Sequence, residues 1–158
     1  EAAVAVLYKR QRFTQDIDLL TPIPKQVKEA SKDFAIREQL AADWLNNRVV
    51  NLDSCKPFGW AECLVPIYEG QNLSLFSVSR KNLLCIKVFS YCDRPEGPAI
   101  DLPDILSMEP TPDEIGEACE WTEREARRQR RSKKELNHFR AAMAELKQRL
   151  DSQLLGST

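Results

Sequence analysis

A dense group of cations in the C-terminal third has the clearest potential for chemistry. Its seven members are Arg124, Arg127, Arg128, Arg130, Arg131, Lys133 and Lys134. Cations concentrated in this way bind polyanions, because they displace the counterions that surround phosphate groups. The group therefore predicts a contact with nucleic acid, and structured RNA is the kind we expect. A smaller basic cluster at residues 9–12 would add to that contact.

The same cations also suit a solvated helix. On a continuous helix they would lie all round the axis instead of along one stripe. Glu120–Arg124 and Glu123–Arg127 stand four residues apart in the favourable order, and each such pair contributes only about 0.2–0.5 kcal/mol. A helix held by charge pairs is therefore one alternative to RNA binding. A contact with an acidic protein and a nuclear-targeting signal are the others.

Six apolar residues at helical spacing follow the cations. They are Leu136, Phe139, Met143, Leu146, Leu150 and Leu154. The first five are separated alternately by three and four residues, which is the pattern of a coiled-coil seam. The pattern is too short for a stable free coiled coil. It predicts docking on a partner helix, through which the chain would bind other protein subunits.

The cysteines and the single histidine predict neither a metal site nor catalysis. The cysteines are Cys55, Cys63, Cys85, Cys92 and Cys119. No two of them form the tight pair that zinc sites favour, so we expect buried thiols. The one histidine, His138, lies beside the seam, far along the chain from the cysteines. A Cys–His or Ser–His nucleophile would depend on it alone.

Other chemical signatures are also missing from the sequence. The five glycines form no phosphate-binding loop, and no pair of carboxylates is placed in a pocket by its spacing. We therefore expect a chain that is not an enzyme, with no cofactor, no metal and no small-molecule substrate. The odd cysteine count favours an intracellular, reducing location. The first residue, Glu1, is consistent with removal of a targeting segment, so a mitochondrial location is also an expectation.

The first 92 residues are expected to form two parts. An N-terminal arm, 1–24, is followed by a small domain, 25–92. Apolar residues at helical spacing predict an amphipathic helix over 25–47. Three stretches rich in β-branched and aromatic residues predict a three-stranded antiparallel meander, and they are Trp60–Tyr68, Leu73–Ser79 and Leu83–Tyr91. Pro66 requires an edge position or a bulge in the first strand.

The remaining chain is predicted to be a connector and a long helix. Residues 93–111 are rich in proline, which favours irregular chain. Thr111, Pro112 and Glu114 form a capping-box sequence that begins a helix. No proline interrupts the stretch that follows, so one helix of about 60 Å is expected over 112–154. A helix of that length would extend beyond the small domain.

These expectations combine into an α+β fold, in which a helix packs on a small meander and a connector leads to a long C-terminal helix. The net charge of −1 by itself predicts no polyanion partner, so the local distribution of charge matters more. No stretch is long enough to span a membrane. We expect a non-catalytic structural or accessory subunit of a larger multi-subunit assembly, for instance a ribonucleoprotein such as an organellar ribosome. The alternative is a homodimeric coiled-coil adaptor protein that binds no nucleic acid.

Overall fold

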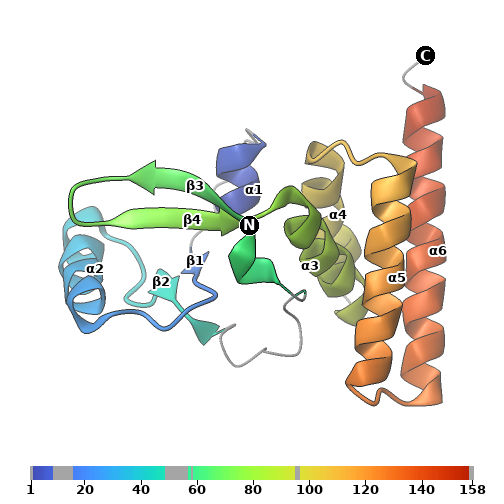
Figure 1. Ribbon diagram of the computed structural model, residues 1–158, viewed down its shortest axis with the longest axis horizontal. Helices are drawn as coiled ribbons and strands as arrows, with labels where there is room; N and C mark the ends of the chain where they lie inside the picture. Colours follow the sequence, from blue (N-terminus) through green and yellow to red (C-terminus); the bar gives the residue numbers. More distant parts are fainter. Residues whose placement is uncertain (1, 9–15, 49–56, 58, 95–96, 157–158) are drawn as a thin grey trace. The chain divides into compact units, whose positions relative to one another are not determined.

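The computed structural model describes residues 2–8, 16–48, 57, 59–94 and 97–156 (Figure 1). Helices and strands both occur there, so the chain is α+β as predicted, but the three-stranded meander is not confirmed. The chain forms two compact units, Glu1–Asp53 and Ser54–Thr158. Each unit is described separately below.

The first unit contains two short parallel strands joined through a helix. Its elements are α1 (Ala2–Leu7), β1 (Ile17–Asp18), α2 (Lys25–Glu38) and β2 (Leu45–Asn46). Ile17 pairs with Leu45 across the two strands. The stretch predicted to be an arm therefore contains regular structure. The basic cluster at 9–12 lies outside the described residues.

Helix α2 begins where the sequence predicts but ends well before residue 47. Gln39 adopts a left-handed conformation, with φ of 56°, and stops the helix. The chain then folds back along α2: the indole Nε1 of Trp44 donates to the Ser31 carbonyl at 2.9 Å, and the rings of Trp44 and Phe34 lie 5.3 Å apart. Trp44 thus packs on the helix instead of extending it.

The second unit begins with a β-hairpin. A short 3-10 helix, η3 (Trp60–Glu62), leads into β3 (Leu64–Glu69), which pairs antiparallel with β4 (Ser74–Val78). The register shifts between Pro66 and Tyr68. This irregularity is the bulge predicted for the proline, which has no amide to donate to the ladder.

The third predicted strand is a helix. α3 (Arg80–Asp93) covers the stretch in question, and the Ser79 hydroxyl accepts from the Asn82 amide at 3.3 Å to cap it. Most of this stretch is apolar, and the helix it forms is surrounded by neighbours, because α3 contacts α4, α5 and α6. Periodicity alone does not separate a short buried strand from a buried helix.

The proline-rich connector also contains a helix, which corrects the expectation of irregular chain. α4 (Gly97–Ser107) has Pro98 in its first turn, where an amide is not needed. Pro103 lies inside the helix, a position that normally weakens it. Burial outweighs this cost, because Ile105 at 0% exposure and the following Met108 at 1% belong to the core.

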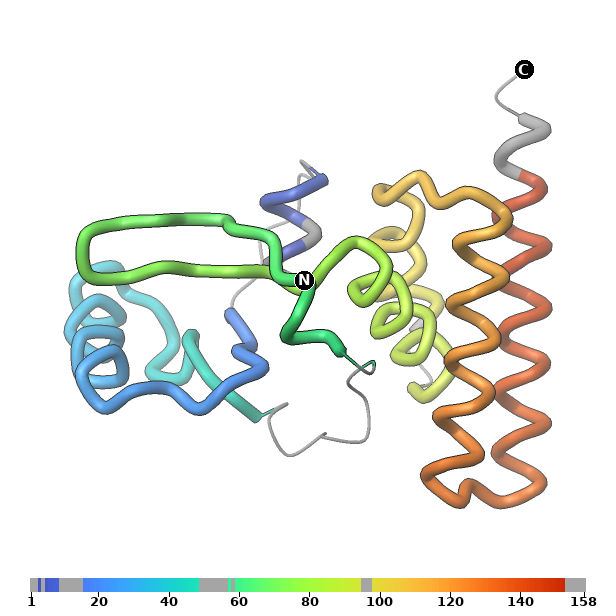
Figure 2. Tube along the Cα trace, in the orientation of Figure 1, coloured from blue at the N-terminus to red at the C-terminus, as the bar shows by residue number. Residues whose placement is uncertain are grey.

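The single long helix of the prediction is two antiparallel helices. α5 (Pro112–Arg128) begins at the predicted capping box, with Thr111 N 2.8 Å from Glu114 Oε2 and Glu114 N 3.2 Å from Thr111 Oγ1. The chain then reverses, as Figure 2 shows, and α6 (Lys133–Gly156) runs back beside α5. We call this pair the helical hairpin.

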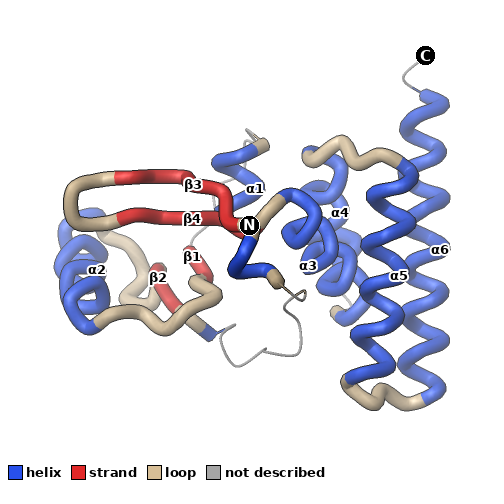
Figure 3. The backbone as a smooth tube through the Cα atoms, viewed as in Figure 1, coloured by secondary structure: helices blue, strands red, loops and turns tan. Residues whose placement is uncertain are grey.

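The core of the second unit lies between the four helices, drawn in blue in Figure 3. α3 is central to it and contributes Val88, which is fully buried, and Phe89. The Phe89 ring lies 5.9 Å from that of Trp121 on α5 and 5.4 Å from that of Phe139 on α6. Edge-to-face contacts of this kind fix the two hairpin helices against α3.

Candidate functional site

The turn between α5 and α6 divides the predicted group of cations. Arg130 adopts a left-handed conformation there, with φ of 57°. Ser132 then caps α6: its amide donates to Glu135 Oε2 at 2.8 Å, and its hydroxyl accepts from the Glu135 amide at 3.3 Å. Neither glycine nor proline marks the turn. The signal that would have found it is Ser132 followed three residues later by Glu135, a second capping box.

Four of the seven cations are neutralised by carboxylates. Arg127 lies 2.8 Å from Glu123, Arg128 lies 2.8 Å from Glu125 and Arg124 lies 3.7 Å from Glu120. Arg131 pairs with Asp93 of α3 at 2.7 Å and with Glu135 at 3.3 Å. The Glu120–Arg124 and Glu123–Arg127 pairs are those expected from the sequence. The pair between Arg131 and Asp93 was not expected, because it depends on how the hairpin packs against α3.

Two of the partner carboxylates have lowered pKa values. Hydrogen bonds from Arg127 and then Arg140 lower the pKa of Glu123. Hydrogen bonds from Ser132 and then Arg131 lower the pKa of Glu135. The contacts of Arg127 and Arg131 with these two carboxylates therefore favour their ionised forms.

Three cations are left at the end of the hairpin. Arg130, Lys133 and Lys134 are exposed and have no ion-pair partner among the described residues. We call these three residues the cation tip. The structure brings them together at one end of the second unit, whereas the sequence predicted seven equivalent cations along a helix. Within the predicted group of seven, only the cation tip carries charge that no carboxylate of the described residues neutralises.

Packing on α3 holds the cation tip in place. Arg131, between Arg130 and Ser132, is anchored to Asp93 and also lies over the Phe139 ring, 5.9 Å from its centroid. Arg131 therefore joins the tip to the core through an ion pair with Asp93 and a cation–π contact with Phe139. The tip is therefore a pre-organised group of charges on a packed scaffold.

The predicted partner-helix seam is covered within the chain. Phe139, Met143 and Leu146 are buried, and Leu136 and Leu150 are half-buried. Their neighbours are α3 and α5 of the same unit. The side chain of Leu154 lies outside the described residues. The 3-4 spacing was therefore a correct signal of helix packing, but the helix it packs against belongs to this chain.

A second group of charges is buried between α3 and α4. Lys87 Nζ lies 2.6 Å from Asp104 Oδ2 and 3.3 Å from Asp101 Oδ1, and Arg94 lies 2.9 Å from Asp101. Both carboxylates are at most 1% exposed. Buried charges are tolerated when they are paired in this way. Sequence reasoning missed this group, because Lys87 stands within a run of apolar residues.

Three of the thiols are buried in surroundings that disfavour their reactive form. Cys85, Cys92 and Cys119 are buried as expected, whereas Cys63 is exposed and Cys55 lies outside the described residues. Burial raises the pKa of Cys85 to about 11 and also raises the pKa of Cys92 and Cys119. Thiolates are the nucleophilic and metal-binding forms. In the part of the chain that the structure describes, no three His, Cys, Asp or Glu side chains are placed to hold a metal ion.

Comparison with known proteins adds no further assignment. No family model matches the sequence, and searches of curated proteins and of solved structures give no match either. Among the described helices, none is both long and apolar enough to cross a membrane.

Proposed function

We propose that the protein is a non-catalytic accessory subunit of a larger multi-subunit assembly, and that its cation tip contacts structured RNA in that assembly. A ribonucleoprotein such as an organellar ribosome is an assembly of this kind. The observation that carries the proposal is the separation of the seven cations: four are neutralised within the chain, and Arg130, Lys133 and Lys134 are not.

The physical argument rests on counterion release. A cation that already faces a carboxylate gains little from a phosphate, since the carboxylate must first be displaced. A free cation on a rigid support displaces the counterions of the RNA backbone without such a loss. Three free cations make a small contact, so we expect the tip to act together with other subunits.

The remaining charged and nucleophilic groups support a structural role. Lys87, Asp101 and Asp104 compensate one another in the core. The buried thiols have raised pKa values, which keep them protonated near neutral pH. The alternative suggested by the sequence, a coiled-coil adaptor, rested on an uncovered seam. Burial of Met143 and Leu146 within the chain leaves less of the seam for a partner helix, which favours the accessory subunit over the adaptor.

Charge reversal at the tip tests the RNA contact. The variant Arg130→Glu/Lys133→Glu/Lys134→Glu is compared with the unmodified chain by binding to a structured RNA at several salt concentrations. We expect weaker binding, and a plot of log affinity against log salt whose slope is shallower by about 2 to 3, because each phosphate contact contributes roughly 0.7–0.9.

A matched variant controls for overall charge. Lys25→Glu/Lys28→Glu/Lys32→Glu makes the same change in charge on the exposed face of α2, and it should leave the slope near that of the unmodified chain. A tip variant with an unchanged slope would sink the RNA contact. Equal effects of the two variants would show that net charge, not the tip, governs binding.

A further inference from the structure

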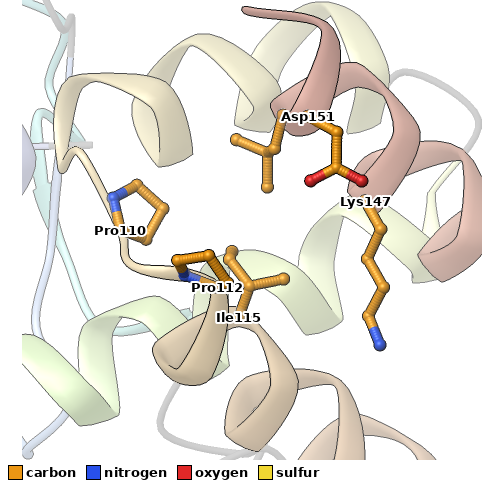
Figure 4. A pocket seen from close by; sticks show the side chains of 6 residues that line it. Pro110, Pro112, Ile115, Lys147 and Asp151 are labelled. Atoms are coloured by element: carbon orange, nitrogen blue, oxygen red, sulfur yellow. The ribbon is translucent and has the colours of Figure 1, made fainter. Parts of the chain in front are cut away.

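A small pocket lies at the end of the helical hairpin opposite the cation tip. It is formed by the first turn of α5, the chain that precedes it and the last turns of α6 (Figure 4). Its walls are Pro110, Pro112, Ile115, Lys147, Leu150 and Asp151, and its volume is about 150 Å³. A cavity of that volume holds a benzene-sized group, whereas ligand and cofactor pockets measure about 300 Å³ or more. The size fits one apolar side chain.

The wall contributed by α5 is fixed in position. Both prolines have restricted φ angles, and the capping box of Thr111 and Glu114 joins the residues around them. The guanidinium of Arg80 on α3 also holds Glu114, through contacts of 2.8 and 3.1 Å. The pocket is therefore already formed in the free chain, so an occupant would not have to order it on binding.

The opposite wall combines an apolar surface with two charges. Leu150 belongs to α6, as do Lys147 and Asp151, which stand one helical turn apart. Figure 4 shows Asp151 across the pocket from the two prolines. Lys147 and Asp151 are exposed, and neither has an ion-pair partner among the described residues. The residues that line the pocket thus include apolar side chains, one carboxylate and one ammonium group.

We propose that this pocket is the docking site for a segment of a partner protein, which inserts one leucine- or phenylalanine-sized side chain. A basic residue beside that side chain pairs with Asp151, and an acidic residue on its other side pairs with Lys147. A polypeptide supplies an apolar group and both charges on neighbouring residues. The inference rests on the proposed accessory role and deepens it, because it states where a protein partner binds and with what chemistry.

Short peptides test the pocket directly. The full chain, with labelled isoleucine and leucine methyl groups, is titrated with acetyl-Lys-Leu-Glu-amide, with acetyl-Glu-Leu-Lys-amide, and with acetyl-Lys-Ala-Glu-amide and acetyl-Glu-Ala-Lys-amide as matched controls. We expect saturable shifts of the Ile115 and Leu150 methyl signals with the leucine peptides, and one order of charges should bind more tightly. Each alanine peptide should bind at least about tenfold more weakly, because it leaves most of the pocket unfilled.

Two variants then locate the binding. Leu150→Trp fills the cavity and should abolish the shifts at Ile115, whereas Leu136→Trp, a matched change at a half-buried position near the start of α6, should leave them. Lys147→Asp/Asp151→Lys exchanges two exposed charges and should invert the preferred peptide order. The proposal is overturned by equal binding of the leucine and alanine peptides, by the absence of saturable shifts, or by an unaltered charge preference in the exchange variant.

The RNA experiment separates this inference from the proposed function. Leu150→Trp should leave the salt dependence of RNA binding as it is in the unmodified chain, because the pocket and the tip lie at opposite ends of the hairpin. If the peptides do not bind but the tip variant still weakens RNA binding, only the docking proposal is overturned. If the peptides bind but the tip variant leaves RNA binding unchanged, only the proposed RNA contact is overturned.

Discussion

At the scale of single residues, Lys87 is the clearest test of what holds α3 and α4 together. It is 6% exposed and lies between two carboxylates that are at most 1% exposed. Removing one partner from a buried ion pair leaves an uncompensated charge, which costs about 3–5 kcal/mol. We expect Lys87→Met to lower the free energy of unfolding by about this amount in a urea titration.

A surface pair serves as the control for this prediction. Lys81→Met removes a contact of 2.6 Å with Glu117, in which both side chains are well exposed. This change should lower the free energy of unfolding far less than Lys87→Met does. Adding Asp104→Asn to Lys87→Met should recover part of the loss, because it removes the carboxylate that has lost Lys87, whereas Asp101 keeps its contact with Arg94. Similar small losses for Lys87→Met and Lys81→Met would mean that the cluster is not buried as described.

At the scale of elements, the sign of one mutation distinguishes the helical hairpin from a single long helix. Ser132 caps α6, so Ser132→Ala should destabilise the unit by about 1 kcal/mol, as measured by urea unfolding. In an uninterrupted helix the same change would be neutral or stabilising, since alanine has the higher helix propensity. Ser152→Ala, inside α6, is the matched control and should not destabilise. A stabilised Ser132→Ala variant would contradict the turn.

The elements that the sequence predicted are those with a strong local signal. The β3–β4 hairpin, the bulge near Pro66 and the capping box at Thr111 follow from residues close together in the chain. α3 was mistaken for a strand, and α4 for irregular chain, because burial by other helices decides both. For the candidate site, local spacing found the cations. Which of them remain free depends on Asp93, a residue of α3.

At the scale of the whole molecule, ion pairs between helices make the second unit sensitive to acid. Glu114, on α5, has its pKa lowered to about 2, first by the hydrogen bond from Arg80 on α3 and then by the backbone amide of Thr111. A carboxyl group with a lowered pKa stabilises the fold when it is ionised. Its contribution is complete above the ordinary pKa of 4.5 and is lost as the pH falls towards about 2.

This lowered pKa predicts how unfolding changes with pH. Urea midpoints measured by circular dichroism should fall between pH 5 and pH 2 in the unmodified chain, and they should fall less steeply in Glu114→Gln, which no longer has the titrating group. Both members of the pair are about one-third exposed, so solvent screening keeps the difference moderate. Arg80→Met should have the same effect, because it removes the main cause of the lowered pKa. If the urea midpoint of Glu114→Gln falls with pH as steeply as that of the unmodified chain, the contact between α3 and α5 is not the cause of the acid sensitivity.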